Sequence, residues 1–206
     1  YNNRSELNHN YKAITIADSL INSVKKAVKD KFIDLIVTGT KGASGLKEIF
    51  IGSNTLKMIN HIYSCPILVI PNGYKFAGLH QIVFSTNYKR PFAKKDLIPL
   101  FTLLKHHDAK LKIVQIMEDT TLTDKQKLHK QALIYLLEEL PHVFYKIMYK
   151  TSETQAIKDF IMETQSDMIT FLHRKNNVFY NLINEDVVEK VSFNSPVPIL
   201  ILPAHH

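Results

Sequence analysis

Several residue types and patterns are scarce in this 206-residue chain, and each scarcity excludes a class of structure. A single cysteine, Cys65, excludes an internal disulfide framework and favours a reducing compartment. No apolar run approaches the ~20 residues that a membrane-spanning helix needs, and the start of the sequence lacks the apolar core of a signal peptide. These absences predict a soluble protein of the cytoplasm.

Long runs of like charge are also missing, although the formal net charge is +7. The basic residues are mixed with acidic ones, as in KKAVKDK and KRPFAKKD, and no basic motif is interleaved with aromatic residues. Dispersed charge of this kind is typical of solvated helix faces. A dedicated nucleic-acid surface is therefore unexpected.

Short β-branched runs alternate with amphipathic segments along most of the chain. The strand-like runs are YKAITI, FIDLIVTG, CPILVIP, HQIVFSTN, LKIVQIM, VFYKIMY, DMITFLH and VPILILP. The helix-like segments cover residues 20–30, 54–62, 91–107, 123–140, 152–165 and 184–193. This alternation predicts an α/β fold with doubly wound, open parallel sheets and helices on both faces.

An internal repeat divides the chain into two predicted modules. CPILVIP ends at Pro71 and VPILILP ends at Pro203, 132 residues later, and the same offset places YKAITI beside VFYKIMY. A turn-rich stretch, PNGYKFAG, separates two tandem modules over residues 1–77 and 78–206. By this offset the first module lacks its opening strand, helix and second strand, roughly 53 residues.

Glycine is rare, yet four of the six glycines lie in GTKGASGLKEIFIGS, residues 39–53. This loop leaves a strand at its carboxyl end, where open α/β sheets bind ligands. Gly39 and Gly42 would permit a positive φ and a close approach of the backbone to a ligand. Gly52, Ser53 and Asn54 precede a predicted helix, whose first N–H groups and dipole suit an anion. The loop therefore predicts a phosphate-binding site.

The spacing G-x2-G-x9-G-S, followed by a helix and CPILVIP, resembles the nucleotide-binding signature of the universal stress protein family. The resemblance is specific over residues 34–71, and the order of strands and helices extends it over the chain. It implies that ATP binds with its phosphates over Gly42, Gly52, Ser53 and Asn54. It also implies an adenine and ribose pocket built partly from the first strand of the same module, so the sequence shows the phosphate half of a site.

The same resemblance implies that two modules, or two copies in a homo-oligomer, pair through their final strands. No Walker motif G-x-x-x-x-G-K-[ST] is present, so no lysine and hydroxyl pair is placed for the β- and γ-phosphates and magnesium. We therefore expect nucleotide binding with feeble hydrolysis or none, and the sequence leaves the need for Mg²⁺ open. No catalytic residue can be named.

The second module has lost the glycine signature. Its corresponding stretch, FLHRKNNVFYNLINED, contains no glycine, and Asn184, Glu185 and Asp186 stand where the first module has Gly52, Ser53 and Asn54. Carboxylates at this place repel a phosphate, so we expect this module to have a structural or regulatory role. The alternative function for the whole chain is a nucleotide-independent interaction or scaffold module with a remnant ATP loop.

Three other groups attract attention but have simpler interpretations. His106, His107 and Asp108 are adjacent on a helix and point about 100° apart, which favours a surface helix end over a metal site. Cys65 precedes a proline at the start of a strand and is interpreted as a buried, inert thiol. The pair Glu138 and Glu139 has no partner acid and is interpreted as part of a solvated helix face.

Overall fold

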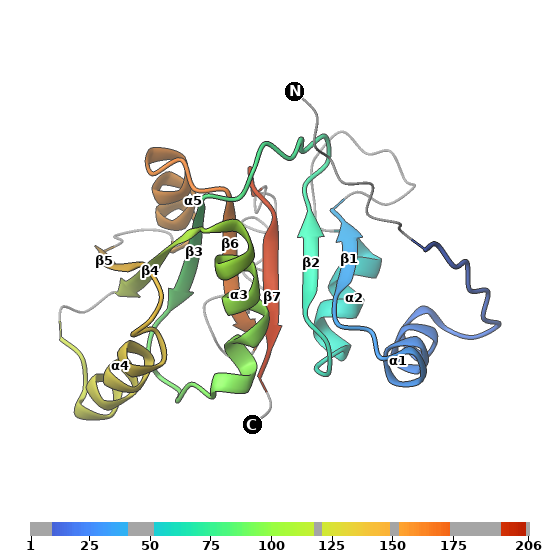
Figure 1. Cartoon of the computed structure of the whole chain (residues 1–206), viewed down its shortest axis with the longest axis horizontal. Helices are drawn as coiled ribbons and strands as arrows, with labels where there is room; N and C mark the ends of the chain where they lie inside the picture. The colour runs from blue at the N-terminus through green and yellow to red at the C-terminus, as the bar shows by residue number, and fades with distance from the viewer. Residues whose placement is uncertain (1–9, 41–51, 118–120, 149–152, 174–194, 205–206) are drawn as a thin grey trace.

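The computed structural model describes residues 10–40, 52–117, 121–148, 153–173 and 195–204. Its strands form one sheet in the order β1-β2-β7-β6-β3-β4-β5 (Figure 1). They are β1 (Ile36–Gly39), β2 (Ile67–Ile70), β3 (Gln81–Thr86), β4 (Lys110–Met117), β5 (His142–Met148), β6 (Met168–His173) and β7 (Ile199–Pro203). The helices are α1 (Leu20–Lys31), α2 (Ser53–His61), α3 (Lys94–His107), α4 (Asp124–Leu136) and α5 (Glu153–Glu163).

The sheet consists of two parallel groups that meet in one antiparallel contact. β1 and β2 are parallel, and β7, β6, β3, β4 and β5 are parallel to one another. β2 and β7 lie side by side and run in opposite directions (Figure 1), with Ile67 opposite Ile201 and Val69 opposite Ile199. The α/β architecture is confirmed, and CPILVIP and VPILILP pair within the chain. The module boundary at residues 77 and 78 stays a prediction.

Local signals read from the sequence set the helix starts. Ser19 is the N-cap of α1, and its hydroxyl accepts a hydrogen bond from the backbone N–H of Asn22 at 3.3 Å. Thr123 and Gln126 form a reciprocal capping box at the start of α4. No helix among the described residues is long and apolar enough to cross a membrane.

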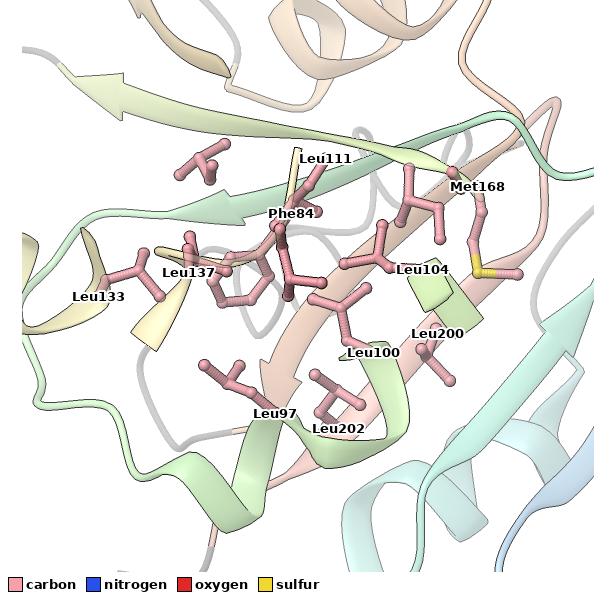
Figure 2. Close-up of a cluster of buried hydrophobic side chains, with 14 of the residues drawn as sticks. Phe84, Leu97, Leu100, Leu104, Leu111, Leu133, Leu137, Met168, Leu200 and Leu202 are labelled. Atoms are coloured by element: carbon pink, nitrogen blue, oxygen red, sulfur yellow. The ribbon is translucent and has the colours of Figure 1, made fainter. Parts of the chain in front are cut away.

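Hydrophobic cores lie on both faces of the sheet. On one face α3 and α4 cover the sheet, and their leucines point toward Phe84, Leu111 and Leu200 from the strands (Figure 2). On the other face α2 and α5 contribute Ile59 and Ile161, which pack with strand residues including those of β2 and β7. The contact between β2 and β7 is therefore part of a continuous core.

Two strand predictions at the N-terminal end are wrong or need correction. YKAITI does not form a strand, and Tyr11 within it is 91% exposed. FIDLIVTG was expected to be buried on both faces, but β1 covers its last four residues and Val37 is 61% exposed. The physical reason is shared: among the described residues β1 has one neighbour, β2, so the strands that would pair with YKAITI and cover β1 are absent. Ser152 and the predicted helix at 184–193 lie outside the described residues.

A stacked pair of rings joins the two groups of strands. Tyr63, between α2 and β2, lies over His173 at the end of β6, with ring centroids 4.8 Å apart and planes 9° from parallel. Burial lowers the pKa of His173 below its usual value, although a hydrogen bond with the backbone of Ile59 acts in the opposite direction. The imidazole is therefore neutral in the folded protein at neutral pH.

This pKa shift predicts that stability falls on acidification. The unfolded chain takes up a proton at His173 near pH ~6.5, while the folded chain resists it until a lower pH. The contribution is complete above pH ~6.5 and is lost as pH falls toward the lowered folded pKa. Urea unfolding at pH 7 and pH 5 should show a smaller loss in His173→Phe, which keeps a stacked ring, than in the wild type. Equal losses in the two proteins would contradict the assignment, and Tyr63→Phe is the control.

Candidate functional site

The glycine loop begins and ends at one point of the fold. Gly39 is the last residue of β1, and Gly52 stands directly before α2. The backbone N–H of Gly52 donates to the carbonyl oxygen of Thr40 at 2.7 Å. Residues 41–51, including Gly42, lie outside the described residues. The two ends of the loop are thus joined at the carboxyl edge of β1, where the sequence placed the site.

Threonine side chains hold the same edge together. The hydroxyl of Thr55 in α2 donates to the carbonyl oxygen of Gly39 at 2.9 Å and lies 3.0 Å from the hydroxyl of Thr38. The hydroxyl of Thr40 accepts from the backbone N–H of Asn72, the second residue after β2, at 3.1 Å. These contacts fix the start of α2 against the carboxyl ends of both strands. Sequence reasoning missed these three threonines, and their one signal is their place beside the glycines in VTGTKG and GSNT.

The start of α2 has the features of an anion site. Gly52 is its N-cap and offers no side chain to cap the first turn, which contains no acidic residue. Ser53 and Asn54 are exposed. The first N–H groups of a helix have no partner within the helix, and the positive end of its dipole lies there. Gly52, Ser53 and Asn54, predicted from the spacing, are therefore brought together with their backbone amides at the edge of the sheet.

The expected reason for one glycine does not hold. Gly39 belongs to β1, and the described glycines with a positive φ are Gly73 and Gly78. Gly52 has φ −57° and ψ 147°, a conformation that other residues adopt readily. At both positions the absence of a side chain, and not an unusual backbone, is what a ligand would use.

The other candidate groups are placed as follows. His106 and His107 end α3 at the surface, and no cluster of metal-binding side chains occurs in the described parts of the chain. Cys65 is 2% exposed, its thiol donates to the carbonyl oxygen of Ile33 at 3.3 Å, and burial raises its pKa. The prediction of a buried thiol is confirmed.

Glu138 and Glu139 are exposed, as predicted, but they also border a cavity. The cavity has a volume of about 260 Å³, and Lys94 and Lys105 of α3 line it as well. Its charges are thus mixed, and it lies away from the glycine loop. Asn184, Glu185 and Asp186 of the second module lie outside the described residues.

Comparison with known proteins supports the assignment made on the glycine loop. Residues 9–71 match the model of the universal stress protein family. The chain is 43% identical over 42 residues to the universal stress protein YxiE of Bacillus subtilis (strain 168), a match that covers 20% of this chain and 28% of that protein.

Solved structures agree on the fold. A universal stress protein from Archaeoglobus fulgidus DSM 4304 is similar over 88% of this chain, with 19% identity and a TM-score of 0.63. A functionally unknown protein of Pseudomonas aeruginosa PAO1 is similar over 90% of the chain, with 14% identity and a TM-score of 0.56.

The matches span 65% of the Archaeoglobus chain and 68% of the Pseudomonas chain, so each of these proteins is longer than the part matched here. At these identities the structures speak for the fold alone, and the family assignment depends on the glycine-loop segment. Through residues 9–71, the chain belongs to the universal stress protein family.

Proposed function

We propose that this chain binds an adenine nucleotide, with ATP as the ligand to test first, and acts in a stress response without catalysing a reaction. One observation carries the proposal: α2 starts uncapped and free of acidic residues at the carboxyl edge of β1 and β2. The bond between Gly52 and Thr40 fixes that start in place. Phosphate oxygens are suitable ligands for amides arranged in this way.

Backbone amides give affinity for phosphate but supply no acid, base or metal ligand. The amides of Ser53 and Asn54 can each contribute about 1.5–3 kcal/mol to a charged phosphate oxygen. No group of the described residues stands ready to activate water beside them. The proposal therefore includes weak hydrolysis at most.

Two further solved proteins of the family contain adenine nucleotides. A universal stress protein from Archaeoglobus fulgidus is in complex with dAMP, and another universal stress protein is in complex with cAMP. Their TM-scores to this chain are 0.42 and 0.44. The proposal for this chain does not depend on these distant likenesses.

A nucleotide-independent interaction module is the second candidate function. The observation that favours it is the exposed apolar surface near β1, where Phe32 is 87% exposed and Val37 is 61% exposed. Surfaces of this kind mark interaction sites more often than ligand sites. The two functions are separable, because an interaction through this surface does not require ATP.

Titration calorimetry with ATP tests the proposed function. We expect saturable binding to the 206-residue chain, and at least tenfold weaker binding in Gly52→Val, whose branched side chain would stand over the amides of Ser53 and Asn54. Valine adopts the φ and ψ of Gly52 readily, so the melting temperature should change little. Ala77→Val, an exposed position outside the site, is the control.

Absence of saturable ATP binding, or equal affinity of wild type and Gly52→Val, would contradict the proposal. Measuring phosphate release in the same samples addresses catalysis. Sustained release that Gly52→Val abolishes would overturn the non-catalytic part of the proposal and leave the binding part intact.

A further inference from the structure

β1 leaves one edge of the sheet open in the described structure (Figure 1). The backbone N–H groups of Ile36 and Thr40 donate toward the β2 side, to Pro66 and Ile70. Because alternate residues of a strand direct their backbone groups to opposite sides, the N–H groups of Val37 and Gly39 point away from β2. We call this side the outer edge of β1. Such an edge is a template for another strand.

The other group of strands shows what covers the equivalent edge. Ile169 of β6 donates its N–H to Pro198 at 3.0 Å, as Ile36 of β1 does to Pro66 at 2.9 Å. The parallel registers agree as well, since each of these isoleucines lies opposite the residue after its proline. On its opposite side β6 pairs in parallel with β3. β3 therefore occupies, against β6, the position that is open against β1.

A carboxylate at the start of β6 holds β3 in that position. Asp167, two residues before Ile169, accepts through Oδ2 from the backbone N–H groups of His80 at 2.7 Å and Gln81 at 2.8 Å. The residue two positions before Ile36 is also an aspartate, Asp34, and it is exposed. The acceptor for the first two amides of an added strand is thus already present beside β1.

The helix before each strand points to the same missing neighbour. In α5, Ile157 and Ile161 are each 1% exposed and belong to the core that contains Val83 of β3. The residues at the same distances before β1 are Val24 and Val28 of α1, and both are half-buried. No residue of α1 is fully buried. The apolar face of α1 lacks the strand that completes burial of α5.

We propose that the outer edge of β1 binds a strand from another polypeptide, which lies parallel to β1 in the position that β3 holds against β6. Asp34 accepts hydrogen bonds from the first two N–H groups of that strand. An apolar side chain of the strand, in the place of Val83, covers Val24 and Val28 of α1. The occupant is therefore an extended segment with apolar residues toward α1, bound by strand addition to a sheet edge.

A peptide with the sequence of residues 79–87, LHQIVFSTN, is the probe, because this segment contains β3 and the two amides that Asp167 accepts. Hydrogen exchange of the 206-residue chain is measured by NMR with and without the peptide. We expect saturable binding and at least tenfold slower exchange at Val37 and Gly39. Asp34→Ala should weaken peptide binding at least tenfold.

Two controls separate strand addition from non-specific binding. Asp30→Ala removes an exposed aspartate of α1 and should leave the affinity unchanged, and a scrambled peptide should not protect β1. Three outcomes would overturn the proposal: no protection at saturating peptide, equal affinity of wild type and Asp34→Ala, or full protection of Val37 and Gly39 before peptide is added. The last outcome would show that the chain itself, or a second copy of it, already covers the edge. ATP binding is measured separately, so failure here leaves the proposed function untouched.

Discussion

Replacing Ile201 with alanine is expected to lower the free energy of unfolding by about 2–5 kcal/mol. Ile201 lies in β7 at the contact between the two groups of strands, opposite Ile67 of β2 on one side and Phe171 of β6 on the other. It is 2% exposed and belongs to the core that α2 and α5 cover. Truncation removes apolar contacts and leaves a cavity that neighbours on two strands cannot fill without moving.

The measurement is urea unfolding at pH 7, followed by circular dichroism, for Ile201→Ala and a matched control. Ile98→Ala makes the same chemical change on α3, where the side chain is 53% exposed, and should alter stability by about 0.5 kcal/mol or less. A loss below about 1 kcal/mol in Ile201→Ala, or equal losses in the two variants, would show that the antiparallel contact of β2 and β7 does not form a packed core.

The order of strands and helices was predictable because it follows from local patterns. Periodicity found each described helix and every strand except YKAITI, and side-chain chemistry found the caps at Ser19 and Thr123. Burial was less predictable, since it depends on neighbours that a local pattern does not contain. YKAITI and the exposed Val37 in β1 show this: both have strand-like sequences, but the described sheet ends at β1.

The candidate site was predictable in part for the same reason. The spacing of Gly39, Gly52, Ser53 and Asn54 indicated a helix start after a strand, and the structure brings these residues to one edge of the sheet. The threonine contacts were not predictable. They join positions 16 and 32 residues apart, such as Thr55 with Gly39 and Asn72 with Thr40, and such contacts leave no periodic signal in a sequence.

Replacing Asp167 with alanine is expected to destabilise the protein by about 3 kcal/mol, because two hydrogen bonds to a charged acceptor are lost at about 1.5–3 kcal/mol each and water compensates in part. The carboxylate is half-buried and accepts from the first two amides of the central strand β3. It also attracts the ammonium group of Lys112, whose pKa burial lowers. Asp167→Asn, which keeps an acceptor oxygen without the charge, should lie between the wild type and Asp167→Ala.

Asp34→Ala is the matched control, since Asp34 has the same place before β1 that Asp167 has before β6 but is exposed. In the chain alone its replacement should change the free energy of unfolding by about 0.5 kcal/mol or less. A large loss in Asp34→Ala would mean that its carboxylate already binds amides of this chain, and the outer edge of β1 would then be covered. A small loss in Asp167→Ala would remove the basis for assigning a strand-binding role to either aspartate. Comparing the two variants therefore tests, in one unfolding experiment, whether a carboxylate before a parallel strand fixes its neighbour.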